Sequence, residues 1–217
     1  MTGGVFFCVP PFLTQSGGVM MELHAISTGT MPPALWWQAA QAVQFAGADA
    51  VHLREPDWTA SEADAVIRSW SGPARLILNT KTAYTVRPEG IHLPEHAPPE
   101  TVPHSRSVHS PAAAEQAVLN GAERLIAGPV YPPRSKPGAG IGIEAFSRIV
   151  RKVNVPVIAV GGIKPEHMEE LYQAGAAGAA VITGMMGAPD PENSTRQYRK
   201  EVERCMTFSS SAAEFKD

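Results

Sequence analysis

The chain has 217 residues and a net charge of −3. Its length is sufficient to bury the core of one domain, and the lack of a basic stripe argues against nucleic acid as a partner. Only two cysteines occur, Cys8 and Cys205, near opposite ends of the chain. A disulfide framework is therefore excluded, and a reducing, cytoplasmic location is expected.

The first twenty residues differ from those that follow. They lack the basic start and the long apolar run of a signal peptide, and the apolar stretch 5–9 is too short to span a membrane. We interpret residues 1–20 as an extension outside the folded domain, with an added strand or cap as the alternative. Residues 21–205 are expected to form one domain, and residues 206–217 a flexible tail.

Strand-like and helix-like segments alternate throughout the domain. The expected strands are 22–27, 49–55, 74–79, 90–93, 105–109, 123–128, 155–160 and 178–182. The expected helices are 33–45, 61–70, a short one from Lys81, 111–119, 143–153, 165–174 and 191–205. The last two strands are apolar on both faces, which is typical of a buried parallel sheet. We count eight strand–helix units, which predict the α/β class and a single closed (β/α)8 TIM barrel.

Glycines follow each of the last two expected strands. Gly161, Gly162 and Ile163 follow the first, and Thr183 and Gly184 follow the second. Neighbouring loops at this position in a barrel commonly bind phosphate, and glycine lets backbone N–H groups approach an anion closely. The alternative is two ordinary turns that need glycine only for their geometry. We expect a phosphate-binding cup.

Reactive side chains also follow the other strands, where the active sites of barrels lie. They are Arg54, Glu55, Asn79, Lys81, His92, Ser107, His109 and, in the loop after strand six, Ser135 and Lys136. Cationic, hydroxyl and imidazole groups at one mouth suit a phosphorylated small molecule. His92 and His109 titrate near neutral pH and are the candidate acid/base groups, with a structural role as the alternative for each.

Arg54 and Glu55 could equally form only an ion pair, and Lys136 could be a solvated charge. The spacings CxxC and HExxH are absent, as are clustered carboxylates and a dinucleotide-binding GxGxxG motif. We therefore expect neither a metal ion nor a cofactor.

Several segments together resemble the thiamine phosphate synthase superfamily across residues 21–205. They are MELHAIS, HLRE, SRSVHS, GPVYPPRSK, VPVIAVGGI and AGAAGAAVITG. The resemblance implies one of two activities. The synthase joins a pyrimidine diphosphate to a thiazole phosphate with Mg²⁺, and the thiazole tautomerase (TenI type) aromatises a carboxythiazole phosphate by proton transfer.

Differences from the synthase pattern favour the tautomerase branch. The synthase usually has a lysine where this chain has Pro56, an Asn-Asp-Asp run where it has Asn79-Thr80-Lys81, and an aspartate after strand four that is missing here. The loss of two carboxylates should weaken a Mg²⁺ site, because Mg²⁺ prefers oxygen ligands in an octahedral shell. The phosphate-binding half of the site is retained.

We therefore expect an isomerase of the thiazole tautomerase type that acts on a phosphorylated thiazole without a metal. One difference opposes this, because the tautomerase acid/base histidine corresponds here to Pro129. His92 or His109 would have to replace it. The alternatives are a synthase with an altered metal site, or a non-catalytic protein that binds thiazole or thiamine phosphate. A homo-oligomer is also expected, with Trp36 and Trp37 as candidate contacts.

Overall fold

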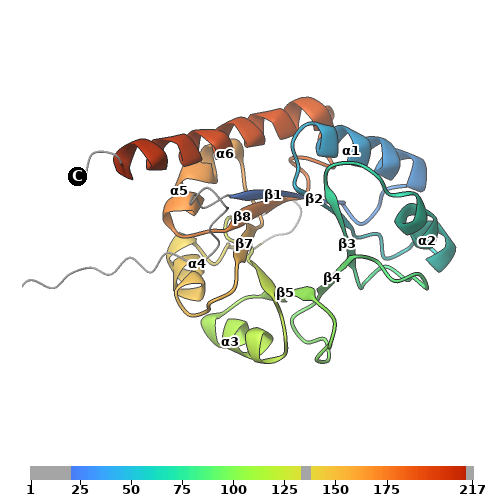
Figure 1. Ribbon diagram of the computed structural model, residues 1–217, viewed down its shortest axis with the longest axis horizontal. Helices are drawn as coiled ribbons and strands as arrows, with labels where there is room; N and C mark the ends of the chain where they lie inside the picture. The colour runs from blue at the N-terminus through green and yellow to red at the C-terminus, as the bar shows by residue number, and fades with distance from the viewer. Residues whose placement is uncertain (1–20, 133–137, 214–217) are drawn as a thin grey trace, which may run out of the picture.

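The computed structural model describes residues 21–132 and 138–213, and it forms a closed barrel of eight parallel strands paired in sequence order (Figure 1). The strands are β1 (Glu22–Ile26), β2 (Ala50–Leu53), β3 (Arg75–Asn79), β4 (Gly90–Leu93), β5 (His104–Val108), β6 (Arg124–Ala127), β7 (Val157–Val160) and β8 (Gly178–Val181). The predicted TIM-barrel fold is confirmed.

The barrel closes where β1 pairs with β8. Glu22 lies opposite Gly178, and Ala25 lies opposite Val181. A Cβ atom on Gly178 would lie 2.5 Å from the carbonyl oxygen of Glu22. Closure therefore requires glycine at this position, because no other residue leaves room for the neighbouring backbone.

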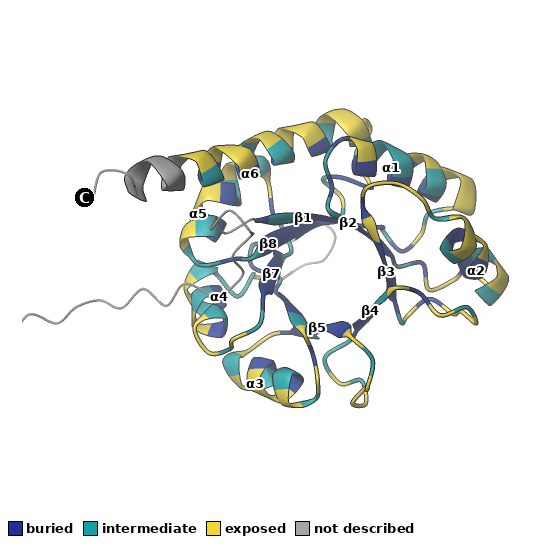
Figure 2. Cartoon of the chain, in the orientation of Figure 1, coloured by how far each residue is buried: buried dark blue, intermediate teal, exposed yellow. Residues whose placement is uncertain are grey.

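Helices cover the outside of the barrel, with their exposed faces directed away from the strands (Figure 2). They are α1 (Pro33–Phe45), α2 (Ala60–Ser69), α3 (Pro111–Leu119), α4 (Ile143–Val150), the 3-10 turn η1 (Pro165–His167), α5 (Met168–Gln173) and α6 (Pro191–Ala213). Helix α6 continues past the expected end at residue 205. None of the helices in the described part of the chain is both long and apolar enough to cross a membrane.

The expectation of eight complete strand–helix units was wrong, because loops replace the helices after β3 and β4. After β3, the side chain of Asn79 accepts the backbone N–H of Lys81 at 3.1 Å. Further along, the Asp64 carboxylate accepts the backbone N–H groups of Thr85 and Val86. These side-chain acceptors hold the segment as a turn against α2, where a helix would need its own carbonyl groups.

Trp36 and Trp37 on α1 belong to the outer core, which is the apolar layer between the helices and the barrel. Trp36 is fully buried, and its ring lies about 6 Å from those of Trp58 and Trp70, with centroid distances of 5.9 Å and 6.0 Å. Trp37 packs edge-on against Trp70. Trp36 is therefore not available as an oligomer contact, and the homo-oligomer remains a prediction without its support.

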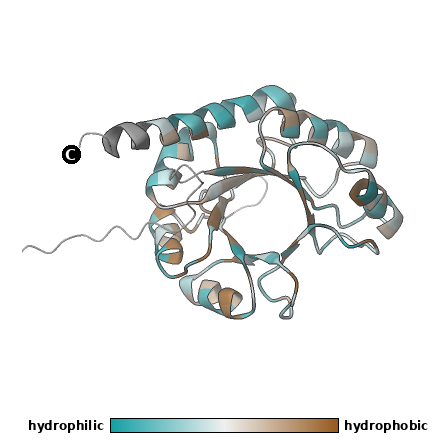
Figure 3. Ribbon diagram, in the orientation of Figure 1, coloured by the Kyte–Doolittle hydropathy of each residue, from teal (hydrophilic) through white to brown (hydrophobic). Residues whose placement is uncertain are grey.

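The inside of the barrel is divided into an apolar part and a polar part. Ile26, Ile126, Ile158 and Ala180 form an apolar cluster separate from the outer core. In Figure 3, β5 is coloured as more hydrophilic than β7. Because strand side chains alternate between the two faces, β1, β2 and β4 place His24, His52 and His92 inside the barrel.

The histidines of β1 and β2 form a hydrogen-bonded chain that begins at Glu22. Burial alone would raise the pKa of Glu22, but the hydrogen bond and charge of His24 and the charges of two arginines lower it to about 2. The ionised carboxylate accepts the Nε2 proton of His24 at 2.8 Å. Nδ1 of a neutral His24 then accepts the Nε2 proton of His52 at 2.9 Å, which leaves Nδ1 of His52 as a buried acceptor without a partner in residues 21–132 and 138–213.

Burial lowers the pKa of His24, His52 and His92 below the ordinary value of 6.5. In the unfolded chain these histidines therefore become protonated as the pH falls through 6.5, whereas in the folded chain they stay neutral. Their stabilising contribution is present above pH 6.5 and is lost as the pH falls below it, at about 1.4 kcal/mol per histidine per pH unit.

We expect urea unfolding to show a steep loss of stability between about pH 6.5 and pH 5. Replacing one buried histidine, in His52→Leu, should make this slope shallower by about 1.4 kcal/mol per pH unit. The matched control is His96→Gln, because the side chain of His96 is 93% exposed. Equal slopes for the two variants would contradict the assignment of His52 as a neutral, buried group.

Candidate functional site

A cavity of about 610 Å³ opens at the carboxyl ends of β7 and β8. Gly161, Gly162 and Ile163 line it from the loop after β7, and Thr183 and Gly184 line it from the loop after β8. The structure thus brings together all five residues of the expected phosphate cup. The proposed ligand itself remains a prediction.

The loops after β6 and β7 approach each other backbone to backbone. Gly162 has φ +65°, and a Cβ atom there would lie 2.7 Å from the carbonyl oxygens of both Tyr131 and Pro132. Gly161 has φ +95° and faces the ring of Pro129. Hydrogen bonds from Val130 N to Val160 O, at 2.8 Å, and from Tyr131 N to Gly161 O, at 3.1 Å, fix this contact. Both glycines are therefore required by space as well as by conformation.

Helix α6 supports the cup from behind. The Tyr198 hydroxyl donates to the carbonyl oxygen of Ile163 at 2.9 Å, and Ser194 donates to the carbonyl oxygen of Gly184. A Cβ atom on Gly184 would collide with the Tyr198 hydroxyl. These two side chains, 35 and 10 residues away from their partners, hold both halves of the cup in place.

A second polar cluster joins β4 and β5 inside the barrel, with Ser107 toward the carboxyl end of β5. Nε2 of His92 is 2.8 Å from the Ser107 hydroxyl, and Nδ1 is 2.9 Å from the Ser105 hydroxyl. Ser105 donates to the carbonyl oxygen of Ile91, so it accepts from Nδ1 of His92. Nε2 of His92 must then accept the hydroxyl proton of Ser107. This leaves the lone pairs of Ser107 available to a ligand.

Burial lowers the pKa of His92 to about 3. The imidazole is therefore neutral at physiological pH, and both of its nitrogens are occupied. His92 is better placed to orient Ser107 than to move a proton. His109 is separate from this cluster, since its half-exposed ring pairs with Glu95 at 2.7 Å.

Glu55 has a supporting position in the structure. It is buried, and its carboxylate accepts the backbone N–H groups of Gly29 and Met31 at 3.1 Å and 2.9 Å. It thereby fixes the loop after β1 instead of pairing with Arg54. The guanidinium of Arg54 lies against Gly29, where a Cβ atom would displace it.

The remaining predicted residues divide into two groups. Asn79 is buried and caps the turn that carries the exposed Lys81, at the carboxyl end of β3. Ser135 and Lys136 lie outside the described residues. The start of their loop is anchored, because the ring of Tyr131 stacks on His167 at 3.9 Å and its hydroxyl donates to Glu170 at 2.5 Å.

The sequence was compared with known proteins. Residues 33–185 match the family described as thiamine monophosphate synthase. The chain belongs to this family. A thiamine-phosphate synthase from Haloquadratum walsbyi is 34% identical over 177 residues, which cover 72% of this chain and 79% of that protein. A putative thiamine-phosphate synthase from Geobacter sulfurreducens is 33% identical and covers 69% and 79%.

Among solved structures, a thiamine phosphate pyrophosphorylase from Pyrococcus furiosus has a similar fold. Its TM-score is 0.68 at 26% identity, and the match covers 86% of this chain and 97% of that one. The two relatives described above are named thiamine-phosphate synthase, and such synthases are transferases. The expectation of an isomerase of the tautomerase type was wrong. It rested mainly on the missing carboxylates, and the names of the relatives overturn it.

Three supporting residues were not found from the sequence. Ser105 could have been, because it lies two positions before Ser107 and therefore faces the same side of a strand. Tyr198 and Ser194 carry no local signal. Their role follows only from the packing of α6 against the ends of β7 and β8.

We expect Gly162→Ala to weaken the binding of thiazole phosphate by at least about tenfold, because the new methyl group displaces the carbonyl groups behind the cup. Calorimetric titration of the full chain would measure this. Gly175→Ala is the matched control, since Gly175 also has a positive φ, +86°, but lies just after α5, away from the cup. Equal affinity in both variants would argue against phosphate at Gly162.

Proposed function

We propose that the protein is a transferase of the thiamine-phosphate synthase type, which joins a pyrimidine diphosphate to a thiazole phosphate. The observation that carries this proposal is the glycine-lined cavity at the ends of β7 and β8, in a chain whose relatives are named thiamine-phosphate synthase. The phosphate of the thiazole would bind to the backbone of the cup. Binding through backbone N–H groups suits a phosphate monoester, because the strength of each bond grows with the charge of the acceptor.

Ser107 would contact the second substrate. Its proton is donated to His92, so its oxygen can accept a hydrogen bond from an N–H group of an aminopyrimidine. His92 and Ser105 keep that oxygen in one orientation. In this proposal, His92 is a positioning residue, and Ser107 contacts the substrate.

The family resemblance implies Mg²⁺, so the fit of the rim residues matters. Mg²⁺ prefers carboxylate oxygens. The carboxylate of Glu55 is already occupied by two backbone N–H groups, and that of Glu95 by His109. In residues 21–132 and 138–213, no group of three or more His, Cys, Asp or Glu side chains could hold a metal ion. The residues present do not fit the ion, and we assign no step to it.

The bond between the substrates would form when the thiazole nitrogen attacks the methylene carbon of the pyrimidine and the diphosphate leaves. Positioning makes a large contribution to such a reaction, because the cup and Ser107 hold the two heterocycles together. The negative charge of the diphosphate would be met by Arg54 and Lys81, which follow β2 and β3 at the same rim.

A second candidate is a non-catalytic protein that binds thiazole phosphate or thiamine phosphate. The lack of a carboxylate set favours it, because the diphosphate then has fewer partners that stabilise its departure. The phosphate cup would have the same role in both candidates. Only turnover distinguishes them.

We expect the protein to release pyrophosphate and form thiamine phosphate in equal amounts when both substrates are supplied. Ser107→Ala should reduce kcat/KM by about tenfold or more, because a hydrogen bond to the substrate is lost. The matched control is Ser69→Ala, whose hydroxyl bonds only within α2. Binding of thiazole phosphate without pyrophosphate release would contradict the transferase and support the second candidate. Absence of both would contradict both proposals.

A further inference from the structure

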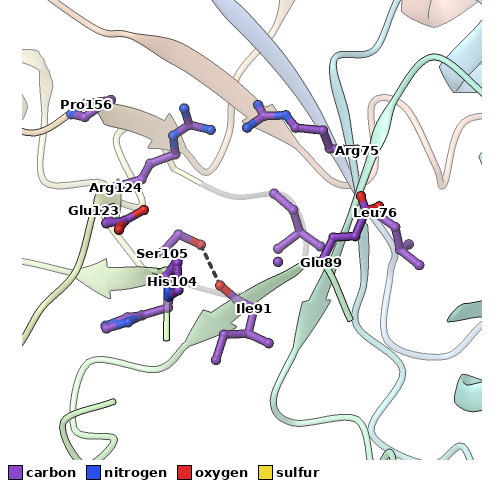
Figure 4. Close-up of a pocket in the computed structure, with 12 residues that line it drawn as sticks. Arg75, Leu76, Glu89, Ile91, His104, Ser105, Glu123, Arg124 and Pro156 are labelled. Carbon is purple, nitrogen blue, oxygen red and sulfur yellow. Dashed lines mark hydrogen bonds between the residues drawn. The ribbon is translucent and has the colours of Figure 1, made fainter. Parts of the chain in front are cut away.

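A second cavity, of about 460 Å³, opens at the opposite end of the barrel (Figure 4). Arg75, Gly90, Ser105 and Arg124 line it at or near the amino ends of β3, β4, β5 and β6. The phosphate cup lies at the carboxyl ends of the strands, so the two cavities are at opposite mouths. The proposed synthase reaction does not use this amino-terminal mouth.

The cavity exists partly because Gly90 has no side chain. A Cβ atom there would have its nearest neighbours at 3.5 Å, on Ile77, and at 3.7 Å, on the carbonyl oxygen of Leu76. A larger residue could therefore fill this position without strain. Ile77 and Pro156 supply an apolar wall, and the barrel keeps an opening here that a bulky residue would close.

Two guanidinium groups share a single carboxylate at this mouth. Arg75 Nη2 lies 2.9 Å from Glu22 Oε2, and Arg124 Nη1 lies 2.9 Å from the same oxygen. The same Oε2 atom also accepts the proton of His24. Glu22 thus neutralises one positive charge of two, and its Oε2 atom has no capacity for a further donor.

Arg124 has an unused donor. Its Nε atom is buried and has no hydrogen-bond partner among the residues that the structure describes. Burial lowers the pKa of Arg124, which reflects the cost of keeping this charge away from water. Buried donors are normally satisfied, so this unpaired donor leaves the guanidinium of a residue that lines the cavity incompletely compensated.

The other charges at this mouth are more exposed. Glu89 and Glu123 are exposed residues at the rim of the cavity, and no ion pair joins either of them to Arg75 or Arg124 in the part of the chain that the structure describes. Their charges are screened by solvent, whereas the guanidinium of Arg124 is mostly buried. The inner part of the cavity therefore favours an anion.

We propose that the amino-terminal mouth of the barrel binds a small organic oxyanion, a carboxylate or a phosphate ester. Its oxygens would accept N–H groups from Arg75 and Arg124, because planar guanidinium groups match the geometry of oxyanions. Its apolar part would cover Ile77 and Pro156. This site is separate from the phosphate cup and does not depend on the proposed synthase activity.

Calorimetric titration of the full chain with benzoate and, separately, with inorganic phosphate tests the proposal. Benzoate represents a carboxylate with an apolar body, and phosphate represents the phosphoryl group. To remove the contribution of the cup, the phosphate titration uses Gly162→Ala as its background. The comparison of the two probes shows which oxyanion the mouth prefers.

We expect Arg75→Gln and Arg124→Gln each to weaken binding of the preferred probe by about tenfold. Arg148→Gln is the matched control, because it removes the same charge from an exposed position on α4. Arg124→Gln could disturb folding, since it removes a partner of Glu22. Arg75→Gln keeps the bond between Arg124 and Glu22 and therefore provides an independent test, with circular dichroism as the check on folding.

Two outcomes would overturn the proposal. One is the absence of binding heat for both probes up to about 10 mM in the chain with an unaltered amino-terminal mouth. The other is an affinity of folded Arg75→Gln within roughly twofold of that of Arg148→Gln. Loss of benzoate binding in Gly162→Ala would assign that probe to the cup and would equally overturn a site at the opposite mouth.

Discussion

The close approach of the loops after β6 and β7 is the constraint on which the rim of this barrel depends. No space remains for a side chain at Gly161 or Gly162, because the backbone of residues 129–132 occupies it. Hydrogen bonds between Val130 and Val160, and between Tyr131 and Gly161, hold the two loops together. The shape of the cup is therefore set by backbone atoms, whose positions depend little on side-chain rotamers. Such a rigid surface suits a charged group that must bind in one orientation.

The interior of the barrel is unusually polar. Barrels of this size are commonly filled by branched apolar side chains, and here the apolar cluster around Ile126 and Ile158 fills only part of the space. A chain from Glu22 through His24 to His52 occupies another part, and His92 connects to Ser107 at the carboxyl rim. Each of these buried groups is stable only while it is neutral or paired with an opposite charge. The stability of the fold is therefore coupled to pH through residues that also shape the site.

The two mouths of the barrel differ in the polar groups that they present. The carboxyl mouth presents backbone groups supported by Tyr198 and Ser194. The amino mouth presents two arginines that share Glu22. The arginine pair gives the barrel a polar feature at an end where barrel enzymes normally carry only stabilising contacts.

Strand positions, the barrel fold and the five residues of the cup could be predicted from the sequence, because apolar runs and the glycines after them are local signals. The missing helix after β3 could not, since the turn depends on Asp64, some 20 residues earlier. The pairing of Glu55 with backbone N–H groups, in place of Arg54, also required the tertiary structure. So did the neutral state of His92, because the sequence shows which residues can titrate, whereas burial inside the closed barrel decides whether they do.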